Sequence, residues 1–160
     1  MPRIASPYAL NPVLQHRFMI HTSKLPGVQL YGRSSQLPGF DNTPVTVDHM
    51  NGYVKVKGKT KWNDITIQCY HFEGITTIGL WAYFNGQHQL VQLANDRHPD
   101  VYKHDMQIWM LNPAQAPLGR WKLVGAFISS LSWGDMDWGS SDVAECTLTI
   151  SYDYAKYEGV

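Results

Sequence analysis

The strongest constraint on the fold is a strict alternation of apolar and polar residues in 144–154, near the C-terminus. The apolar positions are Ala144, Cys146, Leu148, Ile150, Tyr152 and Tyr154. The polar positions between them are Glu145, Thr147, Thr149, Ser151 and Asp153. Successive side chains of a β-strand point to opposite faces of the sheet. The pattern therefore predicts a strand with one apolar face and one hydroxyl-rich face.

A second β-rich run, residues 121–132, precedes this strand. The connection between them contains Gly134, Gly139, Ser140 and Ser141, which are typical of turns. The two runs are expected to form an antiparallel pair joined by a long loop. The rest of the chain must then cover the apolar face of the pair.

Two other segments alternate in the same way, residues 62–71 and 102–110. In the first, the apolar positions are Ile65, Ile67 and Cys69, and the polar ones are Asp64, Thr66 and Gln68. In the second, His104, Met106, Ile108 and Met110 share one face, and Lys103, Asp105, Gln107 and Trp109 share the other. A further strand is expected at residues 16–21.

One helix is expected, from Ile75 to about Phe84, with Asn85-Gly86 as its stop signal. Its apolar stripe is assigned to Ile75, Ile78, Trp81 and Ala82. The predicted core combines this stripe with the two best strands: Ile65, Ile67, Cys69, Ile78, Trp81, Leu148 and Ile150.

Residues 40–61 predict a long hairpin that turns at Asn51-Gly52. Its apolar residues are Val45, Val47, Val54 and Val56, and Lys55, Lys57, Lys59 and Lys61 alternate along the second strand. Such a thinly apolar hairpin buries little within its own domain. It is either a surface ribbon whose charged edges block aggregation, or an arm that docks on another subunit. The sequence does not decide between these two interpretations.

The remaining segments are assigned as turns, loops and an arm. Residues 1–14 contain three prolines and are interpreted as an extended arm, with a disordered terminus as the alternative. Two Leu-Pro-Gly turns begin at Leu25 and Leu37, with a short strand near Val28 and Leu30 between them. Residues 87–99 are expected to be a surface loop with a helical turn at 90–93. The predicted fold is mainly β, or α+β by strict count. It is an antiparallel β-sandwich or barrel of about seven strands with one flanking helix, forming a single domain over 15–160.

The charge balance narrows the function classes. Thirteen Lys and Arg residues equal thirteen Asp and Glu residues, so the net charge is zero. A dedicated nucleic-acid-binding protein has a basic excess, whereas a near-neutral surface favours self-association. Two cysteines indicate free thiols in a reducing compartment. No apolar run approaches the length of a membrane span, so no membrane partner is expected.

Chemical motifs are weak throughout the chain. The chain has seven histidines, which are common metal ligands, but neither Cys69 with His71 nor His98 with His104 has a spacing typical of a metal site. The aspartates of the 133–142 loop are interpreted as turn-forming residues, because an EF-hand loop would need a different arrangement. No nucleophile or phosphate-binding motif is present. We therefore expect no catalytic, cofactor or metal site, and a protein that is not an enzyme.

From about Phe18 to Tyr154 the chain resembles the tail tube proteins of contractile-tailed bacteriophages. The residues that carry the resemblance are Gly58 with Trp62-Asn63-Asp64 and the Ile65-Thr66-Ile67 strand, Gly125-Ala126-Phe127, Asp137-Trp138, the 145–154 strand and the Leu-Pro-Gly turns. The order and spacing of these motifs are more specific than any one of them. The N-terminal arm has no match in the family pattern.

The resemblance implies a small β-sandwich that forms hexameric rings, which stack into a hollow tube. The implied partners are the chain itself, the tail sheath protein, and baseplate and tail terminator proteins. Tape measure protein and DNA would occupy the lumen without sequence-specific binding. The implied location is the virion tail, with assembly in the host cytoplasm.

Within such a tube, we expect the polar faces of two strands to line the lumen. The expected lumen residues are Asp64, Thr66, Gln68, Glu145, Thr147, Thr149 and Ser151. DNA is held by Lys and Arg contacts to phosphate, so a wall of hydroxyl, amide and carboxylate groups lets it slide. The hairpin residues Val45, Val47, Val54, Lys55, Val56, Lys57 and Lys59 are expected at contacts between subunits, the lysines paired with acidic groups.

Three alternatives stay open. One is the tube protein of a type VI secretion system or of a phage-tail-like particle, and another is a baseplate protein that initiates the tube. The third, from a different class, is a monomeric carbohydrate-binding module that uses Trp109, Trp133 and Trp138.

Overall fold

The computed structural model describes residues 14–22, 32–71, 75–88 and 98–159. Most of the predicted N-terminal arm, the short strand near Val28 and Leu30, and the helical turn at 90–93 lie outside the described residues. In the described part, no helix is long and apolar enough to cross a membrane.

The described residues form nine strands and two helices. The first five strands are β1 (Phe18–Thr22), β2 (Gly32–Ser35), β3 (Phe40–His49), β4 (Gly52–Trp62) and β5 (Ile65–Tyr70). The helices α2 (Ile75–His88) and α3 (Pro99–Tyr102) follow. The chain ends with β6 (His104–Leu111), β7 (Pro117–Ser132), β8 (Glu145–Ser151) and β9 (Tyr154–Gly159). The mainly antiparallel β fold predicted from the sequence is confirmed, since every strand pairing is antiparallel.

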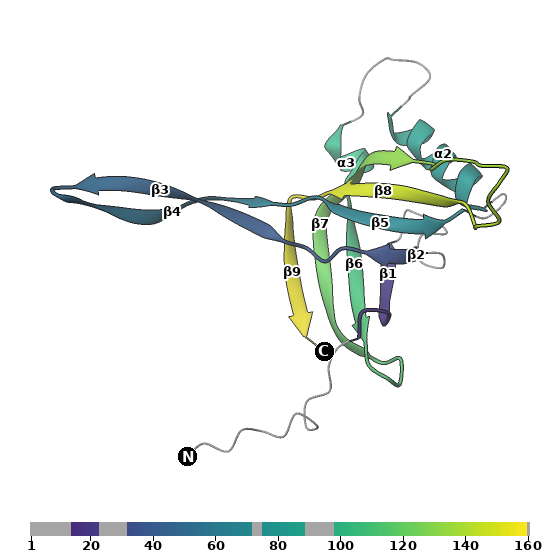
Figure 1. Ribbon diagram of the computed structural model, residues 1–160, viewed down its shortest axis with the longest axis horizontal. Coiled ribbons are helices and arrows are strands. Elements are labelled where there is room, and N and C mark those ends of the chain that lie inside the picture. The colour runs from purple at the N-terminus through teal and green to yellow at the C-terminus, as the bar shows by residue number, and fades with distance from the viewer. Residues whose placement is uncertain (1–13, 23–31, 72–74, 89–97, 160) are drawn as a thin grey trace.

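Seven strands form one sheet in the order β1-β6-β7-β8-β5-β2, with β9 also paired to β7. The long strand β7 belongs to two differently oriented parts of this sheet (Figure 1). Residues 117–126 of β7 pair with β6, and 119–124 pair with β9. Residues 127–132 pair with β8 instead. The change of partner occurs next to Gly125, whose φ of +66° suits glycine.

Both parts of the sheet contribute to one hydrophobic core. Its fully buried side chains include Ile20, Ile65, Ile67, Met106, Ile108, Leu123, Ile128, Leu148 and Ile150, with Cys69 and Cys146 beside them. Five of the predicted core residues are therefore buried: Ile65, Ile67, Cys69, Leu148 and Ile150. This is the burial that period-2 alternation predicts for strands with one covered face.

The predicted core face of the helix is wrong. Ile78 is 68% exposed and Trp81 is 47% exposed, whereas Leu80 is fully buried and Tyr83 packs against the core. The helix itself has apolar residues on more than one side, so its sequence is compatible with more than one apolar stripe. Packing on the rest of the domain buries the stripe that contains Leu80. The helix also continues past Asn85-Gly86 to His88.

The C-terminal strand is also shorter than predicted. It ends at Ser151, and the chain then bends at Tyr152-Asp153 and begins β9 at Tyr154. Strand β9 pairs with the first half of β7 rather than extending β8. Residues 99–102, expected to lie in or beside a surface loop, form the short helix α3.

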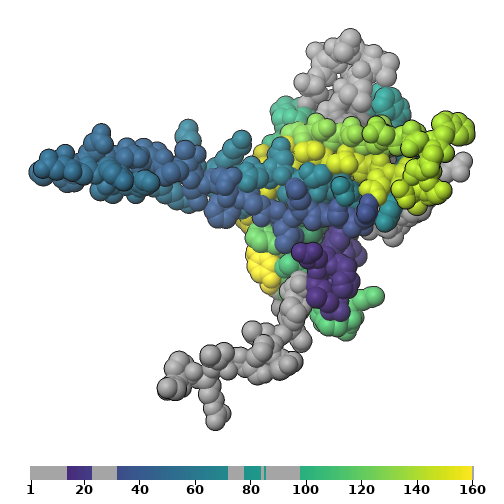
Figure 2. All heavy atoms as spheres, in the orientation of Figure 1, coloured from purple at the N-terminus to yellow at the C-terminus, as the bar shows by residue number. Residues whose placement is uncertain are grey.

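Strands β3 and β4 form a separate two-stranded sheet that projects from the body of the molecule (Figure 1). The predicted hairpin is confirmed, but its turn residues are Met50 and Asn51, one position before the predicted Asn51-Gly52, because Gly52 already pairs with His49. Figure 2 shows that the outer part of this ribbon has no other described element packed on it in this view.

Candidate assembly surfaces

The β3-β4 hairpin has an apolar face and a basic face. Register pairs Val45 with Val56 and Val47 with Val54, so the four valines share one face. Side chains one residue along point the other way, which places Lys55 and Lys57, the register partners of Thr46 and Pro44, on the opposite face. Lys59 and Lys61 lie at and beyond a shift in the register, and Lys61 is the partner of Asp41. All four valines are about half exposed. A ribbon with both faces exposed buries little apolar area, and two-stranded hairpins are only marginally stable alone.

The base of the hairpin is fixed to the body by aromatic and polar contacts. Phe40 packs edge-on against Trp62 with ring centroids 5.3 Å apart, and Trp62 lies 6.0 Å from the ring of Tyr152. Asn63 Nδ2 donates to Asp41 Oδ2 at 2.9 Å, and the Asn63 amide donates to the Gly39 carbonyl. These contacts hold the direction of the ribbon as it leaves the domain.

The lysines of the hairpin form no ion pair with the carboxylates of the described residues, although Asp41 is the register partner of Lys61. Within the described residues, the ion pairs involve Arg33, His98, Lys103, Arg120 and Lys122 but none of the four hairpin lysines. Their positive charges are therefore available to another molecule.

The outer face of β2, β5, β8 and the end of β7 carries uncharged polar groups, and we call it the hydroxyl face. Its members are Ser34, Thr66, Gln68, Ser130, Ser132, Thr147 and Thr149. Thr66 is paired with Thr149 and Gln68 with Thr147 across β5 and β8. Ser34 Oγ donates to Gln68 Oε1 at 2.9 Å. Four of the residues expected in the lumen thus lie side by side on one sheet face.

The other residues expected in the lumen, Asp64, Glu145 and Ser151, lie at the edges of the hydroxyl face. Asp64 is exposed just before β5, and Ser151 ends β8 half-buried. Glu145 forms an ion pair with Arg33, whose guanidinium also lies 5.8 Å from the ring centroid of Tyr70. Arg33 could not be predicted from the sequence, because β2 is only four residues long and has no clear alternation. Its charge offsets that of Glu145, so this face is less acidic than expected.

The outer face of β6, the first half of β7 and β9 is charged instead, and we call it the charged face. Lys122 Nζ lies 2.8 Å from Asp105 Oδ2, and Arg120 Nε lies 2.6 Å from Glu158 Oε2. The guanidinium of Arg120 also stacks over Trp109, 5.1 Å from the ring centroid. The Asp105 carboxylate raises the pKa of Lys122, so the ammonium form is favoured. Opposite charges are thus largely paired within this face.

The connection between β7 and β8, residues 133–144, is exposed from residue 134 to residue 143, and we call it the distal loop. Trp138 is fully exposed, and Met136 and Val143 are also exposed. Asp137 Oδ1 accepts the Gly139 amide at 2.9 Å, and Asp142 Oδ2 accepts the Ser140 hydroxyl. The turn-forming role expected for the aspartates therefore holds for Asp137 and Asp142. No cationic side chain within the described residues forms an ion pair with Asp135, Asp137 or Asp142.

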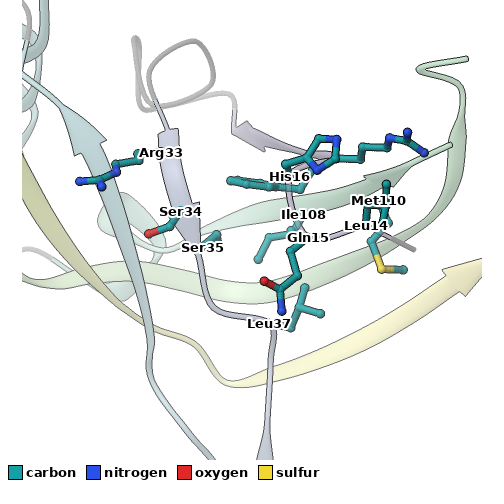
Figure 3. A pocket seen from close by; sticks show the side chains of 11 residues that line it. Leu14, Gln15, His16, Arg33, Ser34, Ser35, Leu37, Ile108 and Met110 are labelled. Carbon is teal, nitrogen blue, oxygen red and sulfur yellow. The ribbon is translucent and has the colours of Figure 1, made fainter. Parts of the chain in front are cut away.

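A cleft of about 700 Å³ opens between the edge strands β1 and β2 (Figure 3). Phe18, Leu37, Ile108 and Met110 give it apolar walls. Its polar lining contains His16, Arg17 and Arg33. These two strands lie at opposite ends of the seven-stranded sheet, so the cleft marks the place where the sheet does not close.

The two cysteines face each other across β5 and β8. Cys69 and Cys146 are register partners, and both are buried as free thiols. A hydrogen bond with Cys146, together with burial, raises the pKa of Cys69, so its thiol stays protonated at neutral pH. No group of three or more potential metal ligands occurs within the described ranges.

The three tryptophans considered for a sugar site have different surroundings. Trp109 stacks with Arg120 and donates from Nε1 to Gln107 at 3.0 Å. Trp133 packs against the core and lies 5.6 Å from the His71 ring, while Trp138 is exposed on the distal loop. Two of the three rings are thus already engaged within the subunit.

Solved structures with a similar fold include chains from contractile injection systems. A chain from the structure of the anti-feeding prophage tube-terminating cap aligns over 100% of both chains, with a TM-score of 0.76 and 20% identity. A chain from the sheath-tube complex of the PVC extracellular contractile injection system covers 93% of this chain and 93% of its own, with a TM-score of 0.69 and 23% identity. Hcp1 from Flavobacterium johnsoniae covers 90% of this chain and 96% of its own, with a TM-score of 0.51 and 15% identity. At these identities the likeness establishes the fold.

Family membership comes from the sequence itself. No curated protein sequence matches the chain significantly. The family model described as T4-like virus tail tube protein gp19 matches residues 43–156, which run from the hairpin through the first half of β9. The chain therefore belongs to the T4-like virus tail tube protein gp19 family and is a structural tail tube protein.

Proposed function

We propose that this protein assembles into hexameric rings that stack into the hollow tube of a contractile phage tail, and that the tube conducts DNA into the host. The observation that carries the proposal is the β3-β4 hairpin, whose valines and lysines are exposed in the single subunit. An apolar ribbon face of this kind is stabilised when a second subunit covers it. Family membership supplies the class of assembly.

In this proposal the hydroxyl face lines the lumen. Thr66, Gln68, Thr147 and Thr149 offer no positive charge to a passing duplex. Each cationic contact to phosphate strengthens DNA binding through counterion release, and a repeated ring of such contacts would hold the DNA in place. Asp64, Glu145 and Ser151 lie at the margins of this wall, where Arg33 neutralises Glu145.

The proposed partners follow from the tube architecture. Tail sheath protein surrounds the tube, baseplate and terminator proteins close its ends, and tape measure protein and DNA occupy the lumen without sequence-specific contacts. The subunit is made in the host cytoplasm and ends in the virion tail. Solved relatives include a tube-terminating cap and a sheath-tube complex, which supports the choice of partners.

A second candidate is the tube of an extracellular contractile injection system that carries a different cargo. The fold likeness to the anti-feeding prophage and PVC chains favours it. Purified particles distinguish the two: DNA-filled heads on the tails support phage function, and headless particles support the injection system.

The test of assembly uses Val54→Asp with Val56→Asp. Both side chains lie on the apolar face of the ribbon, away from the core. We expect wild-type protein to form rings or tubes in negative-stain micrographs, and the double variant to remain an 18.2 kDa species with an unchanged circular dichroism spectrum. Ala114→Asp, in the exposed turn between β6 and β7, is the control for added charge, because it lies outside the hairpin and the distal loop. If the double variant forms normal tubes, the apolar face of the hairpin is not part of the contact between subunits. If the wild-type protein stays monomeric at high concentration, the proposed function is wrong.

A further inference from the structure

The two ends of the subunit have complementary surfaces. The hairpin projects at one end of the molecule, and the distal loop lies at the opposite end (Figure 1). The hairpin carries Lys55 and Lys57 on one face, and Lys59 and Lys61 follow nearer its base. The distal loop carries Asp135, Asp137 and Asp142 and contains no basic residue. Neither set is neutralised by an ion pair within the part of the chain that the structure describes.

Exposed apolar groups accompany the charges at both ends. The hairpin exposes Val54 and Val56 on its apolar face, and Tyr53 near its tip. The distal loop exposes Trp138, Met136 and Val143. A fully exposed tryptophan costs hydration free energy, and tryptophan is enriched at the centres of protein interfaces. Each end thus combines charge with uncovered apolar area.

The other surfaces of the subunit fit the hairpin less well. The cleft between β1 and β2 has apolar walls, but no carboxylate is among its described lining residues, so it offers the lysines no ion pair (Figure 3). On the charged face, Asp105 and Glu158 are already paired with Lys122 and Arg120. The hydroxyl face offers few charges. Among the described surfaces, the distal loop therefore gives the best charge complementarity.

We propose that the hairpin of one subunit docks on the distal loop of a second copy, with Lys55 and Lys57 facing Asp135, Asp137 and Asp142 and with Trp138 covered by the contact. This proposal rests on the proposed function, because it assumes self-assembly. A contact between two different surfaces at opposite ends is head-to-tail, and such contacts generate closed rings when the rotation closes and helical stacks when it does not. The acidic partners of the hairpin lysines are then residues of the same protein.

A charge-exchange experiment tests the contact. The first variant carries Lys55→Asp and Lys57→Asp, and the second carries Asp135→Lys and Asp142→Lys. Asp137 is left intact because it accepts the Gly139 amide within the loop. Like charges then meet in every contact between copies of one variant. We expect each variant alone to raise the critical concentration for assembly, measured by light scattering, by at least about tenfold.

Mixing the two variants is the decisive measurement. In an alternating ring, the altered hairpin of the first variant meets the altered loop of the second, and the remaining contacts are between native charges. An equimolar mixture should therefore recover assembly close to the wild-type critical concentration, with rings visible by electron microscopy. The control is Asp100→Lys, an exposed aspartate on α3, which should assemble like the wild type. Recovery in the mixture also establishes that both variants are folded.

Several outcomes would overturn the proposal. It fails if either variant assembles like the wild type, if the mixture stays as unassembled as its components, or if Asp100→Lys is equally impaired. In each of these cases wild-type tubes leave the proposed function standing. Wild-type protein that forms neither rings nor tubes would overturn both proposals.

Discussion

The carboxylate of Asp153 lies over Gly125, in the space that a Cβ atom at residue 125 would occupy. The Asp153 amide donates to the Val124 carbonyl at 3.0 Å, and Lys103 Nζ lies 2.7 Å from Asp153 Oδ1. The chain leaves β8 and enters β9 at Asp153, while β7 changes partner at Gly125. The close approach of these two residues thus fixes the corner where the two parts of the sheet meet.

Gly125→Ala should destabilise the subunit. Its φ of +66° is in the left-handed region, which costs an L-residue about 1–2 kcal/mol, and the new methyl group collides with Asp153. We expect the free energy of unfolding, measured in urea, to fall by at least about 2 kcal/mol. Gly159→Ala is the control, because nothing lies within 4 Å of its Cβ position. An unchanged urea midpoint for Gly125→Ala would mean that the corner tolerates a side chain.

Ile67→Ala and Ile78→Ala should differ strongly in their effect on stability. Ile67 is fully buried between the sheets, and truncating such a residue costs about 2–5 kcal/mol. Ile78 is 68% exposed, so its truncation should change the free energy of unfolding by no more than about 0.5 kcal/mol. Thermal or urea unfolding of the two variants checks this. An equal loss of unfolding free energy in the two variants would show that Ile78 is part of the core, as the sequence predicted.

Arginine on the hydroxyl face should slow DNA ejection. Thr66 and Thr149 are neighbours across β5 and β8, so Thr66→Arg with Thr149→Arg places two cations together on the proposed wall. Repeated around each ring, these cations would bind phosphate and impede sliding. The measurement is the rate of DNA release from particles built with the variant, with Thr66→Gln and Thr149→Gln as the neutral control.

The same assay distinguishes the two outer sheet faces. Gln107→Arg adds a cation to the charged face, beside Lys122. If this substitution slows ejection and the threonine substitutions do not, the charged face lines the lumen instead.

Tyr83 should make the subunit less stable at high pH. Burial raises the pKa of its hydroxyl to about 12, compared with about 10 in the unfolded chain. The native state therefore holds this proton more tightly, and its contribution to stability is complete below pH 10 and is lost as the pH rises through about 12. Tyr83→Phe should flatten the fall in the free energy of unfolding across this range. Exposed Tyr53→Phe is the control and should leave the slope unchanged.

The sequence predicted the features that depend on local periodicity. Alternation in 65–69 and 146–150 identified both central strands, because each has one covered face and side chains of a strand alternate strictly. The same reasoning placed Thr66 and Thr147 on a common polar face, which the register between β5 and β8 brings together. The hairpin was predictable because Asn51-Gly52 separates two runs of alternating valines.

Features that depend on contacts between distant residues were not predictable. The buried face of α2 is chosen by the sheets it covers, so the helix pattern alone favoured Ile78 over Leu80. Alternation continues through Tyr154, and nothing in it reveals the bend at Asp153, which depends on Gly125. The pairing of Cys69 with Cys146 requires the register between two strands that lie far apart in the chain.

Because β7 supplies hydrogen bonds to β6 and β9 in its first half and to β8 in its second, neither part of the sheet can be removed without exposing the other. The two parts should consequently melt in one cooperative transition, without a populated intermediate that retains only one of them. Amides of β6 and β8 would then exchange with deuterium through the same global opening, whereas the β3-β4 hairpin, which pairs with neither, would exchange through local opening long before.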